Sequence, residues 1–436
     1  MAQPIPALNI SQRARRRIAW RLLPFLFILY IVAYLDRVNV AYAALEMQSA
    51  LNFSDRVFGL GAGIFFLGYF LLQIPGALIV ERWSARKWIG PIIICWGIVT
   101  ILTAFIRTSG EFYAARFILG VAEAGFFPGV VVYLSHWFSE KDRAKAVAGF
   151  MCAIPVSQVI GAPIAGLLLG VNWLGLDGWC WLFILTGIPA VLFGIATIFY
   201  MTDWPHQAAW LPEDERSWIS GELEREKERK LARVSYSIWK ALRQREIVLL
   251  TLICFFFVTG EYAFMLWLPT ILKRLSQAGG AAGLSNLSVS LLAAIPYVAA
   301  LAAMLLNGWH SDKTGERRWH TAGPLFVGAG ALLLVVIFGS NVFVAVALFT
   351  VVGACLNAKK PPFWAMPTLT LTKSAAAASI GFINSVGNLG GFVGPFVVGY
   401  LGTATHSFTG GLVFLQANVL IAAVLVLLLR VHRGAE

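Results

Sequence analysis

The sequence contains one charged motif twice: Glu81-Arg82-Trp83-Ser84-Ala85-Arg86-Lys87 and Asp312-Lys313-Thr314-Gly315-Glu316-Arg317-Arg318. In both copies an acid and a base come first, a small residue follows, and two bases close the motif. Each copy also follows the second long apolar run of its half of the chain. A motif repeated at equivalent positions predicts that the chain is built from two structurally equivalent halves.

The composition around these motifs is that of a polytopic membrane protein. Of the 436 residues, 58% are hydrophobic and only 13% are charged, and the mean hydropathy is +0.74. An average soluble domain has roughly a quarter of its residues charged. Soluble globular, disordered, collagen-like and disulfide-stapled secreted classes are therefore excluded. Two halves with equivalent loops in a membrane predict a parallel duplication about an axis along the membrane normal.

Twelve apolar runs reach the length of about 20 residues that a helix needs to span hydrocarbon. No run alternates with period two, so helices rather than a barrel are expected to satisfy the backbone hydrogen bonds. The expected fold class is an all-α polytopic membrane protein with two pseudo-symmetric six-helix bundles. The predicted spans are 18–44, 57–80, 88–107, 111–134, 145–169, 181–201, 247–272, 284–309, 321–340, 342–371, 376–402 and 408–430.

A polar segment separates the two sets of six spans. Residues 203–246 include a dense mixture of Glu, Lys and Arg, and Pro212 with three following acids is typical of a helix start. We interpret the segment as a solvated cytoplasmic linker. The predicted domains are an N-terminal bundle at 1–202, the linker at 203–246 and a C-terminal bundle at 247–436.

The distribution of basic residues predicts the topology. With the N-terminus in the cytoplasm, 26 of the 34 Lys and Arg residues fall in cytoplasmic segments and four in outside loops. Because cytoplasmic loops carry an excess of Lys and Arg, both termini are expected to be cytoplasmic. The expected location is the bacterial inner membrane, where the chain contacts membrane lipid. The net charge of +12 is thereby explained without nucleic-acid binding.

The second copy of the repeated motif resembles the characteristic loop of the major facilitator superfamily. Gly308-x-x-x-Asp312-Lys313-x-Gly315-x-Arg317-Arg318 matches that pattern well. In the first copy, Ala77, Glu81 and Ser84 replace the Gly, Asp and second Gly of the family. The resemblance implies the major facilitator fold, with a cytoplasmic gate motif formed by Glu81, Arg82, Arg86, Asp312, Lys313 and Arg317.

Span 4 supports a narrower resemblance, to the anion:cation symporter family. Its sequence Arg116-Phe-Ile-Leu-Gly-Val-Ala-Glu123-Ala-Gly-Phe-Phe-Pro-Gly129 is similar to the motif of that family. Asp36-Arg37-Val38-Asn39, Phe363-Trp364-x-x-Pro367 and the Asn- and Gly-rich segment 383–395 also agree. The resemblance covers essentially the whole chain. It implies a secondary transporter of a small organic anion, and tartrate, phthalate-like aromatics, nicotinate, hydroxyphenylacetate and sugar acids all stay open as its substrate.

Seven ionisable side chains fall inside predicted spans. Each costs about 2.5–3.5 kcal/mol at a helix centre, so together they cost on the order of 20 kcal/mol before pairing. Such a cost favours a functional role along a water-lined pathway. These residues are Asp36, Arg37, Arg116, Glu123, Glu261, Lys359 and Lys360.

The acids and arginines of spans 1 and 4 suggest a coupling mechanism. A carboxylate beside a guanidinium is ionised, and losing that partner favours the protonated form. A substrate anion that competes with Asp36 or Glu123 for an arginine would therefore drive proton uptake. We predict proton symport with Asp36 and Glu123 as the protonation sites and Arg116 as a substrate ligand. The family resemblance extends substrate binding to Arg37 and Gln158. A purely structural Asp36–Arg116 or Arg37–Glu123 ion pair is the alternative.

Lys359 and Lys360 stand near the middle of span 10, immediately before Pro361-Pro362. One lysine is expected to pair with Glu261 in span 7 and the other to bind a carboxylate, which would favour a dicarboxylate or a carboxylate with a second polar end. Alternatively, span 10 begins later and the lysines reach outward to water. Further candidates for substrate contact are Tyr69, Trp364, Asn384 and Asn388.

Other functional classes receive little support from the sequence. The six His residues lack metal-ligand spacing and no phosphate-binding Gly loop is present, so we expect neither a metal nor a cofactor, with protons as the coupling ion. An uncoupled facilitator or an exchanger of the same anion is the main alternative. A membrane-embedded enzyme or sensor would need a catalytic constellation or a soluble module, and neither is seen. The protein is expected to function as a monomer.

Overall fold

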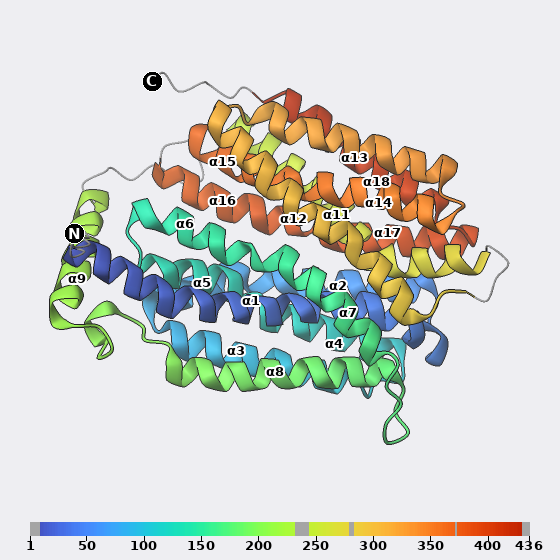
Figure 1. The fold of residues 1–436 in the computed structure, drawn as a ribbon, viewed down its shortest axis with the longest axis horizontal. Helices are drawn as coiled ribbons and strands as arrows, with labels where there is room; N and C mark the ends of the chain where they lie inside the picture. Colours follow the sequence, from blue (N-terminus) through green and yellow to red (C-terminus); the bar gives the residue numbers. More distant parts are fainter. Residues whose placement is uncertain (1–8, 232–243, 279–282, 371–372, 430–436) are drawn as a thin grey trace, which may run out of the picture.

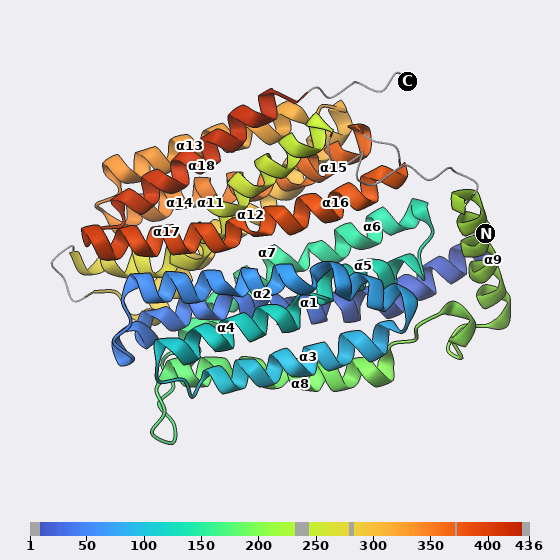
Figure 2. The same ribbon diagram turned by 180° about the vertical axis from the view of Figure 1, so that it is seen from behind.

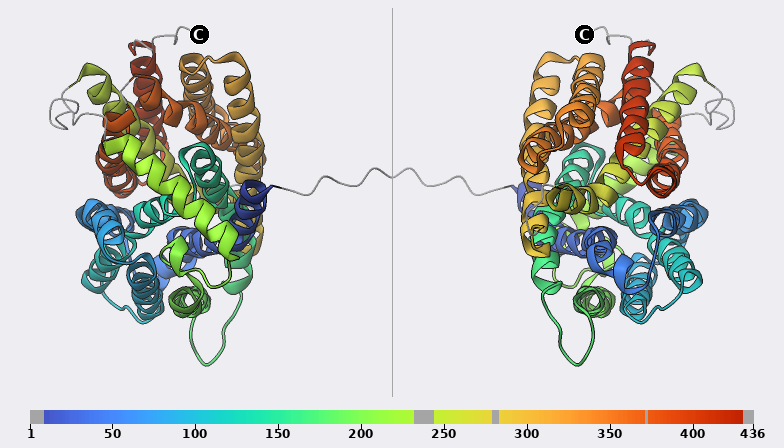
Figure 3. Two further views of the ribbon diagram at one scale, coloured as in Figure 1. Left: turned by 90° about the vertical axis from the view of Figure 1, so that its left-hand side faces the viewer. Right: turned by 90° about the vertical axis from the view of Figure 1, so that its right-hand side faces the viewer.

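The computed structural model describes residues 9–231, 244–278, 283–370 and 373–429. Within these ranges twelve helical segments are long and apolar enough to cross a membrane, which confirms the expected fold class. Figures 1 and 2 show the chain as two stacked groups of roughly parallel helices, with blue to green helices in one group and yellow to red helices in the other. Figure 3, which looks along the helices, shows the same two groups.

The first half consists of six spans, of which the fourth and fifth are each divided into two helices. The helices are α1 (Ile10–Ala50), α2 (Asp55–Arg82), α3 (Ala85–Thr103), α4 (Ser109–Glu123) with α5 (Phe126–Ser135), α6 (Glu140–Met151) with α7 (Ala153–Leu168), and α8 (Gly178–Tyr200).

The second half repeats this plan, with the same two spans divided. The helices are α11 (Arg245–Ala278), α12 (Asn286–Thr314), α13 (Arg318–Phe338), α14 (Val342–Ala358) with α15 (Lys360–Thr370), α16 (Lys373–Asn388) with α17 (Gly390–Thr405), and α18 (Thr409–Leu427). Proline contributes to the breaks: Pro128 and Pro362 lack the N–H that would pair with the carbonyl four residues earlier.

Between the halves lie the short helix η1 (Pro205–Gln207) and the linker helix α9 (Glu213–Leu231). Helix α9 is attached to the start of α1 by ion pairs. Arg13 Nη2 lies 2.6 Å from an Asp214 carboxylate oxygen, and Arg17 Nε lies 3.2 Å from Glu215. The segment that leads into α9 also stacks Trp210 on Trp137, with ring centroids 5.4 Å apart. The described part of the linker therefore sits on the first half.

The two halves pack closely along α2 with α17 and along α7 with α12. Glycine allows this approach at two places in particular. A Cβ atom at Gly59 of α2 would lie 2.5 Å from the carbonyl oxygen of Pro395, and one at Gly166 of α7 would lie 2.8 Å from the Ser290 Cβ. Both distances are too short for a side chain at the glycine, so the glycine backbone itself contacts the other half at both places.

Polar contacts join the halves at the end that carries the 51–54 and 406–408 loops. Asp55 receives two hydrogen bonds from the Arg274 guanidinium, at 2.6 and 2.7 Å. Asn286 Nδ2 donates to Glu46 at 2.7 Å, and the backbone N–H of Arg56 donates to Thr403 Oγ1 at 2.8 Å. We call this set of contacts the 51–54 lock, after the loop that lies beside it. Helix α1 begins and α18 ends at the opposite end of the molecule (Figure 1).

Candidate functional site

The four charged residues of spans 1 and 4 meet inside the first half. Arg37 Nε, from α1, donates to Glu123 Oε2, at the end of α4, at 2.6 Å. Asp36 and Arg116 lie beside this pair, and none of the four residues is more than 7% exposed. The four formal charges cancel, which is how a membrane interior can hold them.

Asp36 has a different hydrogen-bond partner from Arg116, with which the sequence suggested an ion pair. Its Oδ2 accepts a hydrogen bond of 2.6 Å from Thr100 Oγ1 of α3. Thus the Arg37–Glu123 ion pair forms, whereas Asp36 is held by a hydroxyl and interacts with Arg116 at longer range. Sequence reasoning missed Thr100, because a threonine in an apolar span has no distinguishing pattern.

The end of α4 places the Glu123 carboxylate at this site. Glu123 is the last residue of the helix, and Ala124 and Gly125 separate it from α5. The C-terminal end of a helix carries partial negative charge and so disfavours a carboxylate. Arg37 compensates both this dipole and the carboxylate, so the ionised form of Glu123 depends on the guanidinium.

Several buried polar atoms at this site have no hydrogen-bond partner among the described residues. They include Asp36 Oδ1, Glu123 Oε1, Gln158 Oε1, and both Nε and Nη1 of Arg116. The Arg116 guanidinium lies over the Phe65 ring, 4.8 Å from its centroid. A buried donor or acceptor without a partner costs about 1–3 kcal/mol, and more when it is charged. The arrangement can therefore accept both an anion, on Arg116, and a proton, on a carboxylate.

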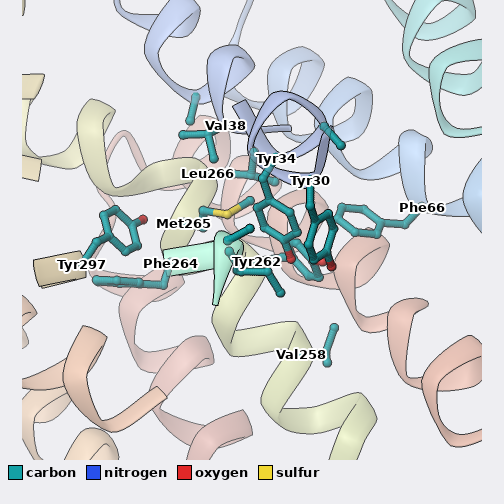
Figure 4. Close-up of a cluster of buried hydrophobic side chains, with 14 of the residues drawn as sticks. Tyr30, Tyr34, Val38, Phe66, Val258, Tyr262, Phe264, Met265, Leu266 and Tyr297 are labelled. Carbon is teal, nitrogen blue, oxygen red and sulfur yellow. The ribbon is translucent and has the colours of Figure 1, made fainter. Parts of the chain in front are cut away.

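Aromatic rings enclose Arg37 and extend toward the second half. The Arg37 guanidinium lies 4.7 Å from the Tyr69 ring centroid and 5.2 Å from that of Tyr34. Figure 4 shows Tyr30 and Tyr34 close to Tyr262 from the second half. Tyr34 is in contact with Arg37, and Tyr262 is the neighbour of Glu261 on α11. These two tyrosines thus lie between the ionic groups of the two halves. Tyr262 was not singled out in the sequence, although it follows Glu261 directly.

A second ionic cluster lies in the second half, between α11 and the break in span 10. Lys359 Nζ lies 2.8 Å from Glu261 Oε2, and Lys360 Nζ lies 2.7 Å from Glu261 Oε1. Lys359 is completely buried, with its Nζ 3.3 Å from the Phe257 ring centroid. Both ammonium groups thus turn toward Glu261 inside the second half. Glu261 pairs with both of them, where the sequence suggested pairing with one.

The proline pair explains why the lysines stand at a helix break. Pro361 and Pro362 cannot donate to the carbonyls of Asn357 and Ala358. Asn307 of α12 supplies a substitute donor, since its Nδ2 donates to the Ala358 carbonyl at 2.7 Å. Lys360 Nζ in turn donates to Asn357 Oδ1 at 2.7 Å. A side chain thus supplies the donor that the Ala358 carbonyl lost, and the backbone N–H of Lys359 donates to the Asn357 carbonyl, as backbone within a membrane requires.

The remaining candidate residues have separate surroundings. Gln158 of α7 is buried, and its Nε2 lies 3.2 Å from Met265 Sδ of α11, so it reaches across to the second half. Trp364 packs edge-on against Phe363, with centroids 5.1 Å apart. Asn384 and Asn388 are partly exposed, and neither side chain hydrogen-bonds to another described residue.

Two residues of the first copy of the repeated motif contact Asp203, an acid that lies outside the motif. Ser84 Oγ donates to Asp203 Oδ2 at 2.8 Å, and Arg86 Nε lies 3.3 Å from the same oxygen. Glu81 and Arg82 are exposed at the end of α2. Asp203 follows span 6 and lies far from the motif in the sequence, which is why the motif alone did not reveal it.

The second copy is organised in a similar way. Arg317 Nη1 donates to Asp312 Oδ1 at 2.6 Å, and Lys313 Nζ lies 5.3 Å from the Trp309 ring centroid. Arg318 donates to the carbonyl of Leu427, at the end of α18. In each half, then, the motif is attached to the end of the sixth span.

Comparison with known proteins gives consistent results along the whole chain. The Major Facilitator Superfamily sequence model matches residues 26–282 and 275–436. A protein of Agrobacterium vitis named "Putative tartrate transporter" is 45% identical over 422 residues, covering 97% of this chain and 95% of the relative. A "Quinolone resistance transporter" of Acinetobacter baumannii is 38% identical, covering 94% and 93%.

The fold also matches a solved structure. A bacterial homolog of the human lysosomal transporter Spinster, in an inward-facing and unoccupied conformation, superimposes with a TM-score of 0.74. The match covers 97% of this chain and 96% of that one, at 16% sequence identity. At this level of identity the likeness concerns the fold alone.

Proposed function

Because this chain belongs to the Major Facilitator Superfamily, and is thus a multi-pass membrane transporter and not an enzyme, we propose that it imports a small organic carboxylate by proton symport. The name of the Agrobacterium vitis relative points to a dicarboxylic acid as cargo. The buried basic groups of both halves have the charge that such a cargo needs. The proposed location is the bacterial inner membrane, with both termini cytoplasmic, since basic residues are concentrated on that side.

The buried Arg37–Glu123 ion pair, with Arg116 and Asp36 beside it, is the observation that carries this proposal. An incoming carboxylate binds Arg116 and competes with Glu123 for Arg37. Glu123 then stands in an apolar interior without its counter-ion, where the neutral acid is strongly favoured. Substrate binding thereby drives proton uptake, and proton release restores the Arg37–Glu123 pair. Asp36 is the second protonation site, held close to Arg116.

The 51–54 lock supports alternating access as the transport mode. Its ion pair and hydrogen bonds join the halves at one end, whereas ion pairs at the opposite end, such as Arg86–Asp203 and Arg317–Asp312, join segments of one half. With cytoplasmic termini, the locked end faces outward, which is the arrangement expected of an inward-facing state. Opening the lock would let the halves rock about the central site.

Proteoliposomes that contain the purified protein distinguish symport from its alternatives. With labelled tartrate outside and the exterior made more acidic than the interior, a symporter accumulates tartrate above its outside concentration. A facilitator brings the two concentrations only to equality, and an exchanger takes up label only when anion is preloaded inside. Collapse of the pH gradient with a protonophore is expected to abolish accumulation. If no carboxylate of a panel accumulates in a gradient-dependent way, the proposal is wrong.

Breaking the lock is expected to shift the protein toward the outward-open state. Asp55→Asn removes the charge that holds Arg274 while keeping a side chain of the same size. With spin labels on cysteines placed at Asn52 and His406, in a background without native cysteines, the distance distribution should move to longer values in the variant. Arg107→Gln changes an exposed charge at the same end and serves as the control. Identical distributions for Asp55→Asn and the parent protein would show that this ion pair does not hold the gate.

A further inference from the structure

The two ionic clusters occupy equivalent places in the two halves but have opposite charge patterns. In the first half, the acid Glu123 stands at the break of the fourth span and pairs with a base on the first span. In the second half, the bases Lys359 and Lys360 stand at the break of the corresponding span and pair with the acid Glu261 on α11. The duplication has thus produced one break that presents a carboxylate and one that presents ammonium groups.

The clusters also differ in net charge. Asp36, Arg37, Arg116 and Glu123 sum to zero when all are ionised, whereas Glu261 with its two lysines leaves one positive charge in excess. An excess cation beside an internal carboxylate can bind an external one. The second half therefore contains the unbalanced charge that an anion would neutralise.

Accessibility separates the two lysines. The Lys359 side chain is 0% exposed and is covered by Phe257, whereas the side chains of Lys360 and Glu261 are 16% and 19% exposed. An incoming anion can therefore approach Lys360 but not Lys359. If that anion displaced Glu261 from Lys360, Glu261 would keep Lys359 as its counter-ion. No bare charge would be left in the apolar interior in either state.

We propose that Lys360 is the specificity-determining residue for a dianionic substrate, with Glu261 holding the position that the second substrate carboxylate takes. This inference rests on the proposed function, since the first carboxylate binds Arg37 and Arg116. Tyr34 lies against Arg37 and, in Figure 4, close to Tyr262, the residue after Glu261, so the proposed dicarboxylate would reach from one cluster to the other past these two rings. One excess positive charge together with one bound proton balances two carboxylates. A dicarboxylate is therefore preferred over a monocarboxylate of the same size.

Tartrate and its monoamide, tartramate, test this inference, because they have the same skeleton and differ in one charge. In proteoliposomes, wild-type protein is expected to show a lower KM for tartrate than for tartramate. Lys360→Gln should raise the KM for tartrate roughly 10- to 100-fold, the range for loss of a charge-assisted hydrogen bond, and leave the KM for tartramate unchanged. Lys360→Arg, which keeps the charge, should restore most of the discrimination.

Lys145→Gln is the control, because it makes the same change at an exposed position of α6, outside both ionic clusters. It should leave the tartrate-to-tartramate KM ratio close to that of wild type. Lys359→Gln removes the counter-ion that Glu261 keeps when substrate binds, so it should lower both the melting temperature and the discrimination. Unchanged discrimination in Lys360→Gln, or an equal loss of discrimination in Lys145→Gln, would overturn the assignment of Lys360 while leaving transport itself established. Failure of the wild-type protein to transport either compound would overturn the proposed function together with this inference.

Discussion

Glu123→Gln is expected to abolish proton-driven accumulation of substrate while leaving substrate exchange across the membrane intact. Glutamine keeps the size of the side chain and can still accept a hydrogen bond from Arg37 Nε, which lies 2.6 Å from the carboxylate in the native protein. It cannot release or bind the transported proton. The variant should therefore resemble the carrier with Glu123 permanently protonated, a form that binds substrate and moves it in both directions.

Two assays on the same proteoliposomes separate these effects. Uptake driven by an inward proton gradient should fall to the level of empty liposomes, and counterflow, in which preloaded unlabelled substrate drives entry of label, should stay near the wild-type rate. Glu111→Gln is the matched control, because it makes the same change at the exposed start of the same helix. Gradient-driven accumulation by Glu123→Gln would contradict the role of this acid in coupling.

Arg37→Gln is expected to destabilise the fold more than the loss of an ion pair at a protein surface would. Glu123 is 1% exposed, so removal of Arg37 leaves a buried carboxylate without its counter-ion. Removing one member of a buried ion pair typically costs about 3–5 kcal/mol. The variant should melt at a clearly lower temperature in detergent, and it should neither bind nor transport substrate.

The double variant Arg37→Gln/Glu123→Gln tells a stability defect from a transport defect. With both charges gone, no uncompensated ion is buried, and most of the lost stability should return. Transport should not return, because neither the substrate ligand nor the proton site is restored. Recovery of gradient-driven uptake in the double variant would show that the pair is purely structural, which was the alternative considered from the sequence.

The number and order of the spans could be predicted because a bilayer imposes a length on each apolar run. Their ends were less predictable. Span 1 was predicted at 18–44, but α1 runs from Ile10 to Ala50. Hydropathy indicates which part of a helix lies in the hydrocarbon of the membrane. The helix itself ends where its backbone groups find hydrogen-bond partners outside it. Here Asn9 caps the first turn and receives the N–H of Gln12, well before the apolar residues begin.

The sequence predicted which residues belong to the candidate site better than it predicted which residues pair with one another. Charged residues in apolar spans stand out because their burial is costly, and those of the first half do come together. Which atom each residue contacts depends on how the helices pack, and the position of a residue in the sequence does not show this. Thr100 as the partner of Asp36, Asp203 as the partner of Arg86, and the shared pairing of both lysines with Glu261 are of this kind.

The interruptions in spans 4, 5, 10 and 11 divide each of these spans into a helix near the lock and a helix near the opposite end. Helices α7 and α17, on the side of the 51–54 lock, belong to the tightly packed contact between the halves. Helices α5, α6, α15 and α16 lie beyond the interruptions, toward the opposite end (Figure 1). A bend at these four interruptions would open the opposite end while the contacts of the lock stay closed, so the proposed cargo would leave without a rotation of the whole of either half.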